Sequence, residues 1–193
     1  MKKSKLILAT LFAFALSSNA FAAATEYKPE PNHTSVLWVA NHLGFSDVSG
    51  KFNGVDGKII YDDKNPKNSS VEVTIDINSL VTGLPKFDKH LKSADFFDEE
   101  KFPTARFASK KITVTGKNKA KIEGDLTLHG ITKTVVLDAV LNNVGPNPFT
   151  KVETLGVSAK TTIKRSDFDM KYGIPNVSDK IDLVIQVEAN PVK

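Results

Sequence analysis

Residues 71–78, Val-Glu-Val-Thr-Ile-Asp-Ile-Asn, alternate strictly between apolar and polar side chains. Successive side chains of a β-strand point to opposite faces of the sheet, so this period of two predicts a strand with one buried and one solvated face. The same alternation returns in residues 122–128 and 181–189. The sequence therefore predicts an all-β fold.

Eight segments share this pattern, and short turns rich in glycine, asparagine and aspartate separate most of them. Short turns favour antiparallel neighbours, because parallel strands need a long crossover connection. We therefore expect antiparallel strands at residues 34–42, 46–61, 70–78, 104–115, 120–128, 131–143, 152–164 and 180–190.

Eight antiparallel strands with one apolar face can form a sandwich or close into a barrel. Closure removes the exposed strand edges, and eight strands leave an interior wide enough for packed side chains or one small ligand. We therefore predict an eight-stranded antiparallel β-barrel. The mostly polar opposite face argues against a membrane barrel, whose outer face must be apolar.

The segment at residues 80–103 is too long for a hairpin turn. Its apolar residues Phe87, Leu91, Ala94 and Phe97 lie at roughly helical spacing before Pro103, which predicts one or two short helices that cover a barrel end. The rings of this region either plug the barrel end as ordinary core or line an apolar pocket. They are Phe87, Phe96, Phe97, Phe102 and Phe107.

Residues 1–22 have the three parts of a cleavable secretory signal peptide. Lysines at positions 2, 3 and 5 precede an uncharged apolar run at residues 6–16, and Ala20-Phe21-Ala22 supplies a cleavage site. The apolar run is shorter than the roughly 20 residues of a membrane-spanning helix. We expect the mature chain, residues 23–193, to be a single domain in the periplasm that does not span the membrane.

The charge of the mature chain is nearly balanced. The sequence has 26 basic and 22 acidic residues, and three of the lysines lie in the signal peptide, which leaves a net charge of about +1. No stripe of basic residues interleaved with aromatic residues occurs, so no nucleic-acid partner is expected. The sequence contains no cysteine, which excludes disulfides and thiolate metal sites.

The sequence contains no familiar catalytic signature, and we expect neither a cofactor nor a metal site. Its four histidines, His33, His42, His90 and His129, are scattered without the close pairs typical of zinc sites. Asp88 and His90 form one suggestive pair, because a carboxylate can orient an imidazole for proton transfer. A spacing of two does not place them on one helix face, however, and the alternative is that each makes a local structural contact.

Five ordered blocks of the mature chain resemble the YceI-like family of bacterial periplasmic polyisoprenoid-binding proteins. The first block, His33-Thr-Ser-Val-Leu-Trp-Val-Ala-Asn-His42-Leu-Gly44, with Gly50 and Phe52 after it, is similar to the opening motif of that family. The other four blocks are residues 88–97, 101–109, 124–133 and 165–168. The resemblance implies a lipocalin-like barrel that holds an extended lipid chain in its lumen and does no catalysis.

Three residues of the first block depart from the family pattern. Thr34 replaces the usual serine, Trp38 the usual phenylalanine and Ala40 the usual valine. A larger ring at position 38 and a smaller side chain at position 40 can reshape the lumen and change the length of ligand that it accepts.

We therefore expect a carrier or sequestering protein for an isoprenoid or another long-chain lipid. A plugged barrel that acts through a surface partner, and an acid–base enzyme that uses Asp88 and His90, are the alternatives, and a homodimer is left open. His42 either contacts a ligand head group or satisfies a buried carbonyl. The predicted ligand-binding residues are Val36, Trp38, Ala40, Phe45, Phe52, Phe102, Phe107, Leu126 and Leu128, with His42 and Arg165 as head-group contacts.

Overall fold

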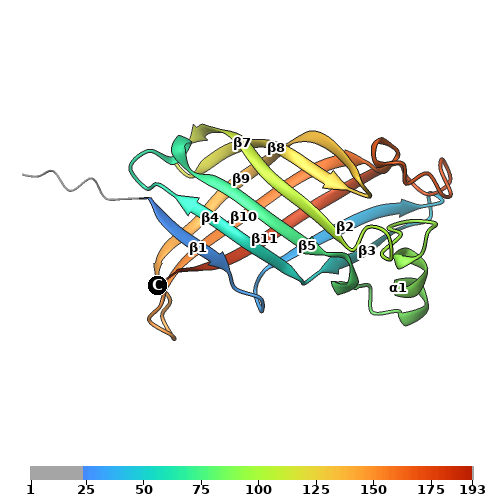
Figure 1. Cartoon of the computed structure of the whole chain (residues 1–193), viewed down its shortest axis with the longest axis horizontal. Coiled ribbons are helices and arrows are strands. Elements are labelled where there is room, and N and C mark those ends of the chain that lie inside the picture. Colours follow the sequence, from blue (N-terminus) through green and yellow to red (C-terminus); the bar gives the residue numbers. More distant parts are fainter. Residues whose placement is uncertain (1–23, 193) are drawn as a thin grey trace, which may run out of the picture.

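The chain forms a closed, eight-stranded antiparallel β-barrel with one α-helix at one end (Figure 1). The computed structural model describes residues 24–192, so the expected signal peptide lies outside the described residues. The elements are β1 (Thr25–Pro29), β2 (Ser35–His42), β3 (Ser46–Phe52), β4 (Val55–Tyr61), β5 (Ser70–Asp76), β6 (Leu80–Val81), α1 (Pro85–Lys92), β7 (Thr104–Gly116), β8 (Lys119–Leu128), β9 (Ile131–Pro146), β10 (Glu153–Lys164) and β11 (Lys180–Pro191), with short 3-10 turns η1 (Pro66–Asn68), η2 (Ile77–Ser79) and η3 (Arg165–Phe168).

Eight barrel positions arise from these strands because two positions are each shared by two strands. β1 pairs with residues 189–191 of β11, and β2 pairs with residues 182–186 of the same strand. Together β1 and β2 therefore make one interrupted wall strand. In the same way β3 pairs with β2 while β4 pairs with β1. The order β4-β5-β7-β8-β9-β10-β11 completes the wall, and the pairing of β1 with β11 closes it.

The predicted barrel is confirmed, with two corrections to its strands. The expected single strand at residues 46–61 breaks into β3 and β4 at Asn53-Gly54, where the Gly54 carbonyl accepts a hydrogen bond from Asp76 N at 2.8 Å. Strand β1 precedes the first predicted strand. Its signal is weak because only Tyr27 and Pro29 are buried in five residues.

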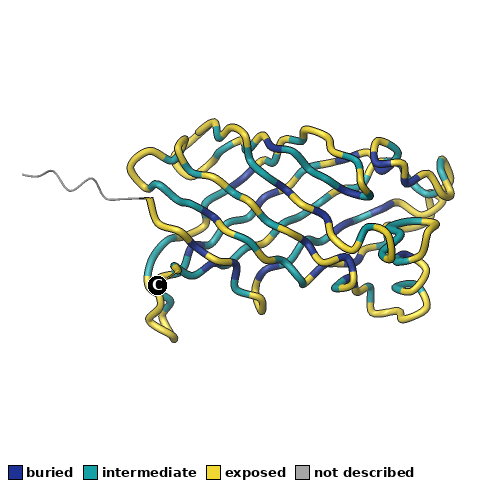
Figure 2. Tube along the Cα trace, viewed as in Figure 1, coloured by how far each residue is buried: buried dark blue, intermediate teal, exposed yellow. Residues whose placement is uncertain are grey.

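Buried or half-buried residues and exposed residues alternate along much of the wall, as the sequence pattern predicts (Figure 2). In β7, for example, Ala105 and Phe107 are buried while Thr104 and Arg106 are exposed. The buried residues form a larger cluster toward the α1 end and a smaller one toward the other end. The hydrophobic core of the protein is thus the inner face of the barrel.

Two large lumen-facing rings lie over glycines of neighbouring strands. A Cβ atom on Gly50 would come within 2.6 Å of Trp38 Cζ2, and one on Gly124 within 2.5 Å of Phe107 Cζ. These contacts are too short for any side chain, so the two glycines make the space in which the rings lie. A glycine beside each large ring thus lets these inward-facing rings fit into the barrel interior.

Helix α1 lies within the segment predicted to cover a barrel end. Pro85 suits the first turn because its missing N–H would have no partner there, and Asp88 Oδ1 accepts a hydrogen bond from Thr82 N at 2.7 Å. Phe87 and Leu91, four residues apart, pack on the barrel core. Among residues 24–192, no helix is both long and apolar enough to cross a membrane.

Candidate functional site: an apolar lumen

The barrel encloses an apolar cavity in two adjoining parts. The part below α1 has a volume of about 270 Å³, and the part toward the opposite end has about 240 Å³. Val36, Ile75, Leu126 and Leu183 line both parts, so the two are neighbours along the barrel axis. We call them the α1 chamber and the far chamber. The barrel is therefore not fully plugged by its own side chains.

Aromatic rings close the α1 chamber. Phe87 on α1 meets Trp38 edge-on with ring centroids 6.4 Å apart, and Phe97 meets Phe52 edge-on at 5.3 Å. Phe96 lies 5.2 Å from the half-exposed ring of Tyr172. These rings pack against one another as ordinary core, and they also line the chamber. The two alternatives considered from the sequence, a plug and a pocket lining, therefore each describe part of this cover.

The far chamber is lined mainly by aliphatic side chains of β4, β5 and the long strands β7 to β11. Ala139 and Ala159, both buried, stand opposite each other on β9 and β10 and leave room in its wall. The turn at residues 116–119 and the ring of Tyr61 lie at the end of this chamber. Burial raises the pKa of Tyr61, and nearby Asp63 and Asp62 add to that shift, so its hydroxyl stays protonated at neutral pH.

Nine of the eleven residues predicted to contact a ligand line this cavity, and two do not. The contact with a ligand itself stays a prediction. The nine are Val36, Trp38, Ala40, His42, Phe52, Leu126, Leu128 and Arg165 in the α1 chamber, and Phe107 in the far chamber.

The placement of Phe45 in the lumen is wrong. Leu43 and Gly44 both have positive φ, at 57° and 76°, and the tight turn that they make projects Phe45 out of the barrel, where it is 89% exposed. Phe102 is also misplaced. Its ring packs on His129, with centroids 4.6 Å apart, and against Gly130, outside the cavity.

Arg165 lines the α1 chamber, but its guanidinium is already engaged. The residue is 4% exposed, and it donates hydrogen bonds to four backbone carbonyls of the segment before β11, those of Met170, Tyr172, Val177 and Ser178, at 2.8–3.0 Å. A guanidinium has five N–H donors, so at most one is left for a ligand. The hydrogen bonds of Arg165 thus mainly hold that segment in place over the chamber.

His42 lies at the rim of the same chamber and is exposed. Its backbone pairs with Val177 in an isolated antiparallel bridge, which ties the end of β2 to the segment that Arg165 holds. The expectation that His42 points toward the lumen agrees with this position, since Val36, Trp38 and Ala40 share its side of the strand.

Asp88 and His90 do not form the acid–base pair considered from the sequence. Both Asp88 contacts go to Thr82, at its backbone N (2.7 Å) and its hydroxyl (2.5 Å), while His90 Nε2 lies 3.0 Å from Asp95 Oδ2. The local structural contact predicted for Asp88 is thus present. His90 also makes a local contact, with the carboxylate of Asp95 five residues further along the chain.

Several other residues that line the cavity are not among those predicted from the sequence. Ile75, Ala139, Ala159 and Leu183 lie at the inward positions of their strands. The alternation that predicts each strand also marks these positions, so the signal for them was present in the sequence.

Comparison with known proteins identifies the family. The family profile described as the YceI-like domain matches residues 27–189. This chain belongs to the YceI-like family. The protein YceI of Escherichia coli O157:H7 is 40% identical over 190 residues, which cover 97% of each chain, and a UPF0312 protein of Pseudomonas putida (strain W619) is 39% identical over 95% of this chain and 96% of its own.

Solved structures of YceI-like proteins share the barrel. A Campylobacter jejuni YceI protein is 35% identical, covers 79% of this chain and 90% of its own, and superposes with a TM-score of 0.70. At 22% and 12% identity, Burkholderia cenocepacia BcnA (TM-score 0.75, 83% of this chain and 98% of its own) and a polyisoprenoid binding domain from Saccharophagus degradans (TM-score 0.64, 88% and 99%) agree with it in fold.

Proposed function

We propose that this YceI-like protein is a periplasmic carrier that holds one polyisoprenoid or similar long-chain lipid inside its barrel and does not transform it. The observation that carries the proposal is the apolar cavity, whose two chambers adjoin along the barrel axis and are walled by aliphatic and aromatic side chains. The signal peptide expected at residues 1–22 supports the location.

The shape of the cavity favours an extended chain over a compact ligand. The α1 chamber and the far chamber meet at Val36, Ile75, Leu126 and Leu183, so a ligand that fills both must be long and thin. Each methylene removed from water contributes about 0.8 kcal/mol, and ten of them therefore offer on the order of 8 kcal/mol before the entropy of binding is subtracted. An apolar chain can bind without any strong polar contact.

The polar groups at the chamber support holding over catalysis. Arg165 is bonded to backbone carbonyls and Asp88 is bonded to Thr82, so the Asp88–His90 pair of the acid–base alternative is not formed. General acid–base catalysis needs a positioned group that reaches the proton it transfers. A binding role needs no such group, since burial of the lipid supplies the affinity.

Trp38 offers a direct test. It is the single tryptophan of the chain and it lines the α1 chamber, so its fluorescence reports on that chamber alone. Titration of the mature protein with geranylgeraniol, a branched isoprenoid alcohol, should shift and saturate the emission at one ligand per chain. An equal titration with a short, water-soluble alcohol should leave the emission unchanged.

A Trp38→Phe variant provides the control, because it removes the reporter and keeps an apolar ring. It should lose the signal yet still retain geranylgeraniol in native mass spectrometry. If wild-type protein shows neither an emission change nor a bound mass with this isoprenoid, the carrier proposal is wrong.

A further inference from the structure

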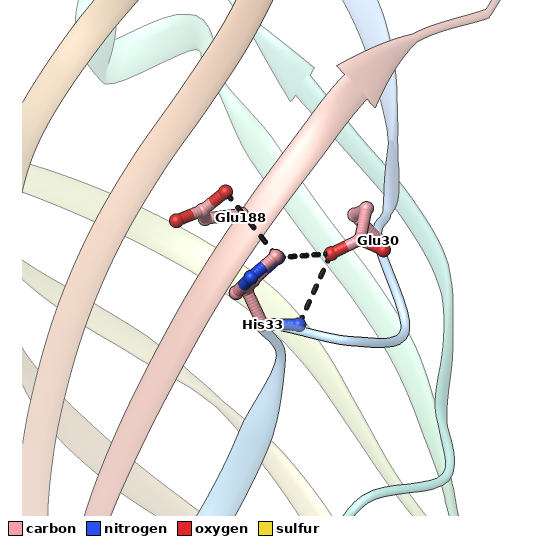
Figure 3. A group of neighbouring side chains, drawn as sticks. All are labelled: Glu30, His33 and Glu188. Atoms are coloured by element: carbon pink, nitrogen blue, oxygen red, sulfur yellow. Dashed lines mark hydrogen bonds and ion pairs between the residues drawn. The ribbon is translucent and has the colours of Figure 1, made fainter. Parts of the chain in front are cut away.

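Three metal-ligating side chains meet on the barrel wall, away from the lumen site (Figure 3). His33 Nδ1 lies 2.7 Å from Glu30 Oε2 and 3.8 Å from Glu188 Oε2. One ligand atom from each residue lies within 4.8 Å of the other two. Glu30 and His33 belong to the turn between β1 and β2, and Glu188 belongs to β11.

The pairing of β2 with β11 brings these residues together. In that antiparallel ladder Ser35 stands opposite Gln186, so the next two-residue step places His33 opposite Glu188. The carbonyl of Glu188 accepts hydrogen bonds from Glu30 N at 2.8 Å and from the buried Thr34 hydroxyl at 2.9 Å. The backbones that carry the three side chains are therefore fixed to one another.

The cluster carries excess negative charge. Among residues 24–192, the Glu30 and Glu188 carboxylates have His33 as their one ion-pair partner, with no lysine or arginine within pairing distance. The Glu30 carboxylate accepts hydrogen bonds from Asn32 N at 3.1 Å, Asn32 Nδ2 at 2.6 Å and His33 N at 3.0 Å. Its own turn therefore holds this carboxylate in place.

The carboxylate of Glu188 makes few contacts that would stabilise the fold. Its backbone is part of the ladder, while its side chain is 42% exposed and accepts no hydrogen bond within the described part of the chain. The contact between Glu30 and His33 is enough to fix the β1–β2 turn, and it does not require the Glu188 carboxylate. The second carboxylate beside one imidazole is the feature that a purely structural role for the cluster leaves unexplained.

We propose that Glu30, His33 and Glu188 form a surface site for a divalent transition-metal ion of the zinc class. The ion takes Nδ1 of His33 and one oxygen of each glutamate, with the imidazole proton on Nε2, and water completes its coordination. Around an ion with bonds near 2 Å, ligand atoms lie roughly 3.3 Å apart, and the distances of 2.7 and 3.8 Å bracket this value. The imidazole favours zinc, nickel or copper over magnesium and calcium, which prefer oxygen ligands.

The bound ion would tie the β1–β2 turn to β11. This junction is where the interrupted wall strand pairs with the last strand and the barrel closes. A ligand that binds the folded state alone stabilises it, so the melting temperature should rise with the zinc concentration.

The test uses the mature chain without a histidine tag, freed of metal with a chelator and titrated with Zn²⁺ by calorimetry. Wild-type protein should bind one ion per chain. Glu188→Gln should weaken binding at least about tenfold and leave the metal-free melting temperature unchanged, because its carboxylate accepts no hydrogen bond. Glu123→Gln, which removes an exposed carboxylate of β8, is the matched control and should bind as wild type does.

A second measurement needs no variant. The chain has four histidines, so Zn²⁺ should move the imidazole NMR signals of His33 and leave those of His42, His90 and His129 in place. Equal affinity in wild type, Glu188→Gln and Glu123→Gln would overturn the proposal. The proposal would also be overturned if the imidazole signals of another histidine shifted at a lower zinc concentration than those of His33. The absence of any binding at millimolar zinc would overturn it as well.

Discussion

Enlarging one inward-facing alanine should weaken lipid binding by a predictable amount. Ala40 is 5% exposed and lines the α1 chamber, so the Ala40→Leu side chain must enter space that the ligand would fill. Leucine adds three carbons and should displace about three ligand carbons. At about 0.8 kcal/mol per methylene, the loss is about 2.4 kcal/mol, which corresponds to a roughly 60-fold higher Kd.

The assay is the geranylgeraniol titration followed by the emission of Trp38. Overpacking of a core costs about 1–3 kcal/mol of stability, so urea unfolding must first show that Ala40→Leu is folded under the assay conditions. Ala108→Leu is the matched control, because Ala108 neighbours the lumen residue Phe107 but has the opposite, outward parity on β7. It should bind with wild-type affinity.

Two results would refute this reasoning. A folded Ala40→Leu protein whose Kd stays within threefold of wild type would mean that the ligand does not occupy the α1 chamber. Equal weakening by Ala108→Leu would mean that the effect comes through stability or through an outer surface, and not through the lumen.

Three further predictions concern stability. Arg165→Met should cost about 3 kcal/mol and lower Tm by roughly 6–12 °C in a thermal scan, because four loop carbonyls lose a charged donor; a loss below 1 kcal/mol would contradict this. Gly57→Ala should cost about 2 kcal/mol or more in urea unfolding, since φ is +138° and the new Cβ would lie 2.2 Å from Glu72 O; a neutral effect would show that the strand relaxes there. The pKa of Asp179 lies below its ordinary 3.8. Burial acts to raise this pKa, but hydrogen bonds from Ser166 lower it by more. Its stabilising effect is therefore present above pH 3.8 and lost as the pH falls through the lower folded value, so Asp179→Asn should flatten the acid side of the stability curve, and an unchanged curve would contradict the assignment.

The barrel itself could be predicted from the sequence because a single physical signal repeats along it. Alternation marks both the strands and their buried faces, and it placed Val36, Trp38, Ala40 and His42 on the lumen side of one strand. Where the backbone departs from a regular strand, the signal fails. The positive φ of Leu43 turns the chain before Phe45, and parity counted through a turn has no meaning there.

Features that depend on the meeting of distant segments could not be predicted. The sequence shows Arg165 near a strand end but not the four carbonyls, further along the chain, that surround it. The cluster of Glu30, His33 and Glu188 depends in the same way on the register between β2 and β11. Spacing within one strand carries no information about such a register, so a search for closely spaced histidines misses this cluster.

The most direct measurement of the central claim is native mass spectrometry of the protein produced with its own N-terminal segment and purified from the periplasm without detergent. The carrier proposal predicts a mass above that of the polypeptide, from one apolar lipid per chain that organic solvent releases. Protein found without lipid, and unable to take up added geranylgeraniol, would contradict it.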